Sequence, residues 1–255
     1  MLVLCYGMQK SGSTLAFELT CGVLQSAGFV QDFIRNDLHE PREGRVFRNY
    51  IDDVSAESID ALIATIGPAR KIAFKTHAGF SDEMFVRLEE LQAKRELQVI
   101  ASYRDPRDIC LSLLDAGEKA RALEKGVFGK FETLDDAAEF VKGRAARFRK
   151  WSSLKGTLRL EYETVAYAPD KAIDRLEGVL GVTADRTVAL EHAFEDSFTH
   201  KNKAARRRYE TEMTDQQKKQ MATTFRRFLR NAVENDNQAW YDKCRANILA
   251  GRGED

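Results

Sequence analysis

The 255-residue chain has no excess of charge of either sign. Forty Lys and Arg residues balance forty Asp and Glu residues, so the formal net charge is zero. A dedicated nucleic-acid binder usually has a strong basic field over much of its surface. The composition therefore predicts that nucleic acid is not the partner of this protein.

The chain also has few cysteines and no long apolar segment. The four cysteines are widely separated and form no C-x-x-C pair, so we expect free thiols in a reducing compartment rather than disulfides or a zinc site. No run approaches the roughly 18 apolar residues that span a bilayer. The apolar start is short and lacks the basic lead of a signal peptide. We expect a cytoplasmic protein without stable membrane insertion; peripheral membrane association and oligomeric state stay open.

No internal repeat, low-complexity tract or linker interrupts the sequence, which predicts a single domain over residues 1–255. Four short apolar runs predict buried strands, at 2–6, 71–75, 98–103 and 157–162. Helical patterns occur at 14–27, 58–66, 82–96, 135–154 and 169–180, with a further helix opened by Pro106. This alternation predicts a three-layer α/β/α fold with a central, mainly parallel sheet, as in P-loop nucleotide-binding proteins. After residue 182 we expect helices only, the last long one near 214–233.

Residues 5–14, CYGMQKSGST, connect the first predicted strand to the first predicted helix. Gly7 and Gly12 are spaced as in the phosphate loop G-x-x-x-x-G-K-[ST], but Ser13 occupies the usual lysine position and Lys10 lies inside the loop. Ligands of an open parallel sheet bind beyond the carboxyl ends of its strands, near a helix start. Loop N–H groups and the helix dipole favour an anion there. The loop therefore predicts a phosphate-bearing ligand.

The position of the lysine distinguishes two kinds of phosphate site. Kinases and nucleotide triphosphatases hold Mg²⁺ with an acidic residue at the end of a neighbouring strand. Here the next two long strands end in FKTH and SYRD, and Asp105 is the only acidic candidate. We therefore expect an anionic ligand bound without a metal. A small-molecule kinase with a degenerate loop and a non-catalytic nucleotide-binding protein are the alternatives.

The loop resembles the 5′-phosphosulfate loop of sulfotransferases that use 3′-phosphoadenosine 5′-phosphosulfate (PAPS). That loop typically runs P-K-S-G-T-T. Here Gln9 replaces the proline, and the five residues that follow match in type and order: Lys10, Ser11, Gly12, Ser13 and Thr14. The resemblance implies that Gln9–Thr14 bind the 5′-phosphosulfate. It also implies PAPS as the donor and adenosine 3′,5′-bisphosphate (PAP) as the product.

Two further segments resemble motifs of the same family. ASYRDPRDICLSLL is similar to the motif that binds the 3′-phosphate, in which Arg104 would offer a bidentate guanidinium and Ser112, eight residues on, a hydroxyl. FKTHAGF is similar to the K-T-H segment that carries the catalytic groups. His77 fits a general base that deprotonates the acceptor. Lys10 and Lys75 fit fixed cations that stabilise the developing charge without an obligatory metal.

The family resemblance is looser in two other places. Tyr162 in LRLEYETV matches a tyrosine near the adenine, whereas Leu15 stands where many cytosolic members have an aromatic residue on the adenine. Residues 199–231 contain ten Lys and Arg against three Asp and Glu. The resemblance implies that one of Arg206, Arg207 and Arg208 reaches the 3′-phosphate, and of these Arg206 and Arg207 are favoured. A solvated loop, or a patch for anionic acceptors or a membrane surface, is the alternative reading.

Residues 29–57 and 115–134 mix aromatic with charged side chains and are the segments expected to shape the acceptor pocket. This mixture favours a polar acceptor, such as a carbohydrate or glycolipid, over a flat phenol. The sequence as a whole predicts a sulfotransferase that moves a sulfuryl group from PAPS to an acceptor hydroxyl or amine.

Overall fold

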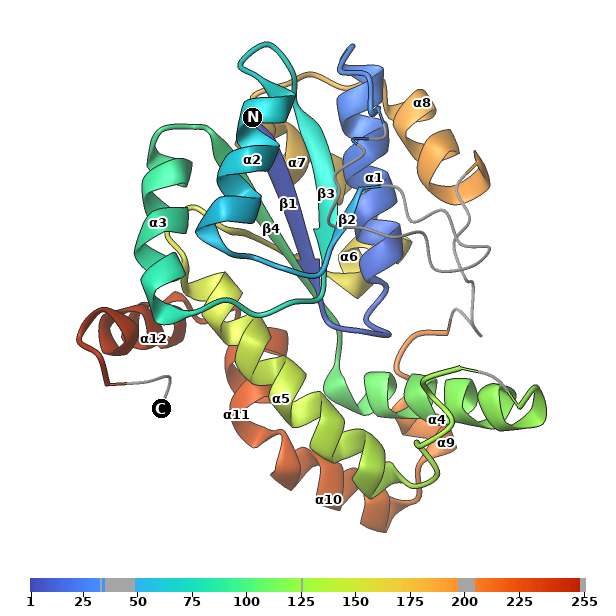
Figure 1. The fold of residues 1–255 in the computed structure, drawn as a ribbon. Helices are drawn as coiled ribbons and strands as arrows, with labels where there is room; N and C mark the ends of the chain where they lie inside the picture. The colour runs from blue at the N-terminus through green and yellow to red at the C-terminus, as the bar shows by residue number, and fades with distance from the viewer. Residues whose placement is uncertain (33, 35–48, 125, 197–204, 253–255) are drawn as a thin grey trace.

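A parallel sheet forms the centre of the computed structural model, which describes residues 1–32, 34, 49–124, 126–196 and 205–252 (Figure 1). Five strands occur in these ranges, in the order β2-β3-β1-β4-β5, and every neighbouring pair is parallel. Their bounds are β1 Leu2–Gly7, β2 Tyr50–Ile51, β3 Ile72–Thr76, β4 Leu97–Tyr103 and β5 Leu158–Glu161. The parallel sheet predicted from the sequence is confirmed, and the two-residue β2 is an addition to it.

Helices follow the strands along the chain. The first half contains α1 Ser13–Ser26, α2 Ala56–Ile66, α3 Asp82–Ala93, α4 Pro106–Ala122 and α5 Leu134–Ser153. The second half contains α6 Tyr162–Tyr167, α7 Pro169–Leu180, α8 Arg186–Glu191, α9 Arg208–Glu212, α10 Asp215–Thr224, α11 Arg226–Phe228 and α12 Gln238–Leu249. Two π-helical turns, η1 His192–Asp196 and η2 Leu229–Val233, extend α8 and α11.

The prediction of one last long helix near 214–233 is wrong. The segment divides at Phe225, whose backbone leaves the helical region at φ −106° and ψ 15°, and α12 follows as a further helix. The side chains of Phe225, Phe228 and Leu229 are all buried. Their i, i+3, i+4 spacing is that of one helix face, so the apolar pattern of the sequence does not reveal the break.

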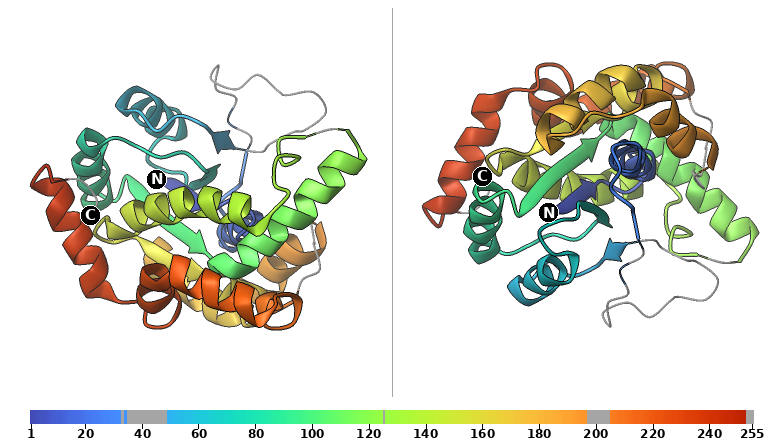
Figure 2. Two further views of the ribbon diagram at one scale, coloured as in Figure 1. Left: turned by 90° about the horizontal axis from the view of Figure 1, so that it is seen from below. Right: turned by 90° about the horizontal axis from the view of Figure 1, so that it is seen from above.

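Alternate residues of β1 enter two different hydrophobic clusters. Leu2, Leu4 and Tyr6 join the cluster that α2, α3 and α5 complete, whereas Val3 and Cys5 join the one formed with α1 and α7. Side chains of a strand point alternately to the two faces of its sheet. The sheet is thus covered by helices on both faces, which gives the three layers (Figure 2).

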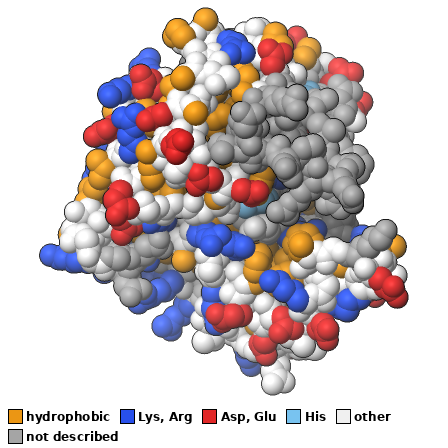
Figure 3. All heavy atoms as spheres, viewed as in Figure 1, with side chains coloured by type: hydrophobic (Ala, Val, Ile, Leu, Met, Phe, Trp, Pro, Cys, Tyr) orange, Lys and Arg blue, Asp and Glu red, His pale blue; other side chains and the backbone are white. Residues whose placement is uncertain are grey.

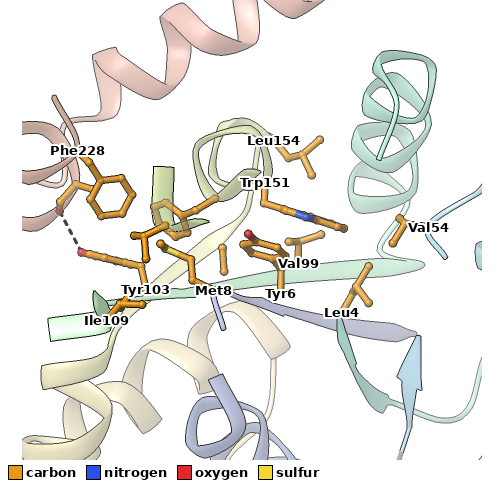
Figure 4. Close-up of a cluster of buried hydrophobic side chains, with 14 of the residues drawn as sticks. Leu4, Tyr6, Met8, Val54, Val99, Tyr103, Ile109, Trp151, Leu154 and Phe228 are labelled. Carbon is orange, nitrogen blue, oxygen red and sulfur yellow. Dashed lines mark hydrogen bonds between the residues drawn. The ribbon is translucent and has the colours of Figure 1, made fainter. Parts of the chain in front are cut away.

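A cluster of aromatic side chains fixes α5 against the sheet (Figure 4). Trp151 is fully buried and stacks on Tyr6 with ring centroids 5.4 Å apart, and its ring centroid lies 4.4 Å from that of Phe80 in a T-shaped arrangement. The indole Nε1–H of Trp151 donates to the carbonyl oxygen of Ala78 at 3.0 Å. This contact ties α5 to the loop that follows β3.

Parallel pairing brings the carboxyl ends of three strands to one edge. Tyr6 pairs with Thr76 of β3, and Gly7 pairs with Ser102 of β4. In Figure 1 this edge faces α4 and α5. The phosphate-type loop, FKTH and SYRD therefore meet where an open parallel sheet binds its ligands.

None of the four cysteines forms a disulfide, and all four are buried. In the described part of the chain, no helix is both long and apolar enough to cross a membrane.

Truncating the central indole tests the core. Trp151→Ala should lower the free energy of unfolding by about 3–5 kcal/mol, because it opens a cavity and leaves the Ala78 carbonyl without its donor. Urea denaturation followed by circular dichroism measures the loss. The exposed Val188→Ala serves as the control and should change the free energy by less than about 0.5 kcal/mol. A loss at Trp151 as small as that of the control would contradict this packing.

Candidate functional site

The loop between β1 and α1 has two residues in the left-handed region, Lys10 at φ 68° and Gly12 at φ 79°. Gly12 is the N-cap of α1, no side chain caps the helix, and no acidic residue occupies its first turn. The first N–H groups of a helix have no acceptor within the helix. The start of α1 can therefore bind an anion through its backbone.

Two glycines of the loop cannot be replaced without a clash. A Cβ on Gly7 would lie 2.2 Å from Cβ of Ser13 and 2.6 Å from Oγ of Ser102. A Cβ on Gly12 would lie 2.3 Å from the ring of Tyr162. The loop is thus packed directly on β4 and on the start of α6, which explains the glycine spacing in physical terms.

His77 follows β3 and is held by the end of β1. Its Nδ1 lies 2.5 Å from the carbonyl oxygen of Gly7. A carbonyl oxygen only accepts, so Nδ1 carries the proton and the lone pair is on Nε2. Burial, and secondly the charge of Lys75, lowers the pKa of His77 to about 3. The imidazole is therefore neutral near pH 7, as a general base must be before it takes a proton.

Lys75 connects β3 to the loop. Its Nζ donates to Oγ1 of Thr14 at 2.7 Å, and burial lowers its pKa to about 8. Lys10 extends toward α4, with its Nζ 5.6 Å from the ring centroid of Phe128. Burial lowers the pKa of Lys10 and the charge of Lys119 adds to the effect. Each lysine gains free energy from an anion placed beside it, because burial makes an uncompensated charge costly.

Arg104 follows β4 and is buried, with 6% of its surface exposed. Its Nη2 donates to Oδ2 of Asp108 at 3.0 Å and to the carbonyl oxygen of Ala205 at 3.0 Å. Its guanidinium lies 4.3 Å from the ring centroid of Tyr162. Among the described residues its buried Nε has no hydrogen-bond partner, and the nearest carboxylate oxygen, of Glu163, is 3.9 Å away. This buried N–H can donate a hydrogen bond to an anion bound beside it.

Two carboxylates at the start of α4, those of Asp105 and Asp108, already accept hydrogen bonds from other residues of the protein. Asp108 is fully buried and accepts from the backbone N–H of Tyr209 at 3.0 Å, which connects α4 to α9. Asp105 accepts from the side chain of Arg107, through Nε at 3.0 Å and Nη2 at 2.6 Å. Asp105 is the acidic residue that the strand-end motifs offer for holding Mg²⁺ beside this loop, and its ion pair with Arg107 disfavours a kinase-type site.

The other residues predicted to bind the 3′-phosphate differ in their surroundings. The guanidinium of Arg206 lies 4.0 Å from the ring centroid of Tyr167, which in turn packs 6.1 Å from that of Tyr162. Arg207 points to solvent, with 71% of its side chain exposed, and pairs with Glu210 at 3.4 Å. Ser112 is buried within α4. The geometry thus places Arg206, rather than Arg207, on the aromatic group beside Arg104.

Gln9, Tyr162 and two of the predicted segments remain to be placed. Gln9 has a buried Oε1 without a hydrogen-bond partner in the described part of the chain. Tyr162 begins α6 and does not end a strand, so its ring packs on the loop rather than in the sheet core. Residues 35–48, within the expected acceptor segment, and 199–204, within the basic segment, lie outside the described residues.

The sequence reasoning missed the contribution of α5. Arg144 of this helix raises no motif signal, yet its charge contributes to the lowered pKa of His77. Tyr50 of β2 was also missed; its ring centroid lies 5.8 Å from that of His77. Arg208 stands in the basic run but is 3% exposed and pairs with Asp115 at 2.9 Å and Glu212 at 2.7 Å. Arg208 is therefore structural, a role that its neighbours in sequence do not reveal.

The low pKa of His77 predicts a pH effect on stability. The unfolded chain binds a proton on this residue below about pH 6.5, whereas the folded chain does so only near pH 3. Stability from His77 is present above pH 6.5 and is lost as the pH falls, by up to about 1.4 kcal/mol per unit. Urea denaturation of the wild type and His77→Asn between pH 7 and 4 isolates this effect, because all other groups are shared. Parallel curves for the two proteins would contradict the burial of a neutral imidazole.

Comparison with known proteins identifies the fold of this chain through solved structures. No protein-family model matches the chain, and no curated protein matches it by sequence. Among solved structures, mouse sulfotransferase SULT7A1 in complex with PAP matches with a TM-score of 0.58 and 17% identity, over 95% of this chain and 88% of that one.

Two other structures are more distant. Retinol dehydratase with androsterone and inactive cofactor PAP has a TM-score of 0.48 and 17% identity, over 89% of this chain and 80% of that one. A sulfotransferase from Alicyclobacillus acidocaldarius has a TM-score of 0.34 and 14% identity, over 72% and 81%. The likeness to the mouse enzyme confirms the architecture that the motifs predicted: this chain has the fold of PAPS-dependent sulfotransferases.

Proposed function

We propose that the protein transfers a sulfuryl group from PAPS to a hydroxyl or amine of an acceptor and releases PAP. The observation that carries the proposal is the neutral His77 beside the half-buried Lys75, at the mouth of a loop whose helix start is uncapped. A base, a cation and an anion-binding backbone at one strand edge are what transfer of an anionic group to a hydroxyl requires.

The donor would be held at two places. The backbone N–H groups and side chains of residues 9–14, with Lys10, would bind the 5′-phosphosulfate. Arg104 and Ser112 would bind the 3′-phosphate, for which the unpartnered Nε of Arg104 is the structural support. Arg206 lies on the same aromatic group and is the better placed of the two C-terminal candidates. The PAP bound by the mouse sulfotransferase of like fold agrees with this assignment.

When bound, the donor supplies an activated sulfuryl group. The chain then has two tasks. Nε2 of His77 accepts the proton of the acceptor hydroxyl, while the Gly7 carbonyl keeps Nδ1 protonated and the ring in place. Lys75 and Lys10 lie on the loop side of the site and donate to the charge that develops on oxygen during transfer. No step needs a metal, and Asp105 is committed to Arg107.

The acceptor proposed from the sequence is a small polar molecule, a carbohydrate or a glycolipid, in a cytoplasmic setting. Of the stretches expected to form its pocket, residues 53–56 line a cleft next to the loop after β3. Lys10 contacts Phe128 in the other stretch. Both contacts support an acceptor site between the β3 loop, α4 and α5.

Replacing His77 tests whether this residue acts in the transfer step and not in the binding of PAP. His77→Ala should reduce turnover by about 100-fold or more, the usual range for loss of a general base, and leave the Kd for PAP within about twofold. Transfer from radiolabelled PAPS across an acceptor panel measures the first quantity, and calorimetry measures the second. His192→Ala is the matched control, since this histidine pairs with Glu18 away from the loop. Near-normal turnover of His77→Ala would remove the residue from the mechanism.

Removing the arginine tests the 3′-phosphate site. The wild type should bind PAP at least about tenfold more tightly than adenosine 5′-monophosphate, because charged hydrogen bonds to the 3′-phosphate contribute about 1.5–3 kcal/mol. Arg104→Gln should abolish this preference and leave the affinity for the monophosphate almost unchanged.

Calorimetry gives both affinities, and the thermal midpoint confirms that Arg104→Gln folds. Arg159→Gln is the matched control, because Arg159 lies within β5 and pairs with Asp236 at 2.6 Å. A preference for PAP that survives Arg104→Gln would show that the 3′-phosphate binds elsewhere.

A further inference from the structure

A cleft of about 800 Å³ adjoins the proposed base. Its walls come from the loop after β2, the loop after β3 and the second half of α5. Gly79 and Phe80, two and three residues after His77, line the β3 side, and Arg147 lines the α5 side. The cleft therefore begins on the β3 loop two residues beyond His77, which itself is not part of the lining.

Arg147 presents an unpaired charge to this cleft. The Nε of Arg147 lies 3.5 Å from the position of a Cβ built on Gly79, so its stem runs along the β3 loop. No described residue pairs with it, whereas the nearby Lys150 is satisfied by Asp82 at 2.5 Å. In Figure 3, Lys and Arg side chains gather over the middle of α5.

Arg144 lies one turn earlier on the same helix and nearer to the base. Its guanidinium lies 4.4 Å from the ring centroid of Phe140, and its carbonyl oxygen accepts from the Tyr6 hydroxyl at 3.3 Å. Its Nε is buried and has no hydrogen-bond partner among the described residues. Tyr6 pairs with Thr76, the residue before His77, so the hydrogen bond from the Tyr6 hydroxyl holds Arg144 close to the strand end that carries the proposed base.

The two arginines are three residues apart, and each lacks a carboxylate in the described part of the chain. Burial and the charge of Arg147 lower the pKa of Arg144, so the pair is mutually repulsive. Two acidic residues line the cleft, Asp53 and Glu83, and among the described residues neither forms an ion pair with Arg144 or Arg147. Asp53 accepts from the hydroxyls of Ser55 and Ser58, at 2.5 and 2.6 Å. An anion between the two guanidiniums would relieve the repulsion and supply the missing acceptor for Nε of Arg144.

We propose that Arg144 and Arg147 bind an anionic group of the acceptor, so that the acceptor is an alcohol or phenol that also carries a carboxylate, phosphate or sulfate. This inference rests on the proposed function. It goes beyond that function by adding a negative charge to the acceptor, which neither the donor site nor the base requires. The two arginines act on binding and orientation of the acceptor and do not exchange protons with it.

The test compares ligands that differ by one charge. 4-Hydroxyphenylacetate and its neutral amide, 4-hydroxyphenylacetamide, have the same phenol and nearly the same shape. Calorimetry in the presence of saturating PAP should show the carboxylate binding at least about tenfold more tightly than the amide. Arg144→Gln and Arg147→Gln should each reduce this preference several-fold while leaving the Kd of the amide within about twofold.

Lys142→Gln is the matched control, since it removes the same charge from α5 at a residue whose side chain is 52% exposed and paired with Glu139. This control should keep the preference. Equal affinity for the two ligands, no measurable binding of the carboxylate, or an equal effect of the control would overturn the proposal.

The binding of PAP itself separates this inference from the proposed function. If PAP binds and the amide accepts a sulfuryl group but no preference for the carboxylate exists, the arginine pair has no role in recognition and the function stands. If PAP does not bind, the donor assignment fails. The ligand comparison, repeated without PAP, then still decides whether the cleft selects anions.

Discussion

The candidate site depends on the parallel pairing of β1 with both β3 and β4. This pairing brings the loop after β1, the histidine after β3 and the arginine after β4 to one edge of the sheet. The hydrogen bond from His77 to the Gly7 carbonyl is a direct consequence, because it joins the ends of β1 and β3. Residues about 70 and 100 positions apart along the chain thus meet without any contribution from long flexible loops.

Positive charge that is partly or wholly removed from water is the second feature of the site. Arg104 is buried, whereas Lys75 and Arg144 are half-buried, and for these two residues burial lowers the pKa. Only part of their hydrogen-bonding capacity is met by the protein, as the Nε atoms of the two arginines show for the described residues. Burying cations with unmet donors costs stability. A site that binds a doubly phosphorylated, sulfated donor and an anionic acceptor would recover that cost on binding.

Much of the fold and part of the site were predictable from the sequence. The strands of the sheet are short apolar runs between turn residues, and the helices are amphipathic, so local patterns identify them. Gly7, Lys10 and Gly12 are recognisable because the loop needs specific backbone conformations. His77 and Arg104 are recognisable because each directly follows a predicted strand.

Other features depend on packing that no local pattern encodes. β2 has two residues and is too short to have a period. The 214–233 segment divides at Phe225, although its buried residues Phe225, Phe228 and Leu229 keep the spacing of one helix face. Arg206, Arg207 and Arg208 are equivalent in sequence, yet one stacks on a tyrosine, one faces solvent and one is buried in ion pairs. Arg144 and Arg147 look like ordinary helix surface residues until α5 is placed across the strand ends.

The most direct test of the central claim is a calorimetric comparison of PAP with ATP, each with Mg²⁺ and with a chelator. PAP should bind with a Kd that is independent of Mg²⁺ and at least about tenfold lower than the Kd of ATP. Tighter binding of ATP that requires Mg²⁺ would contradict a phosphosulfate site and assign the loop to a nucleotide triphosphate.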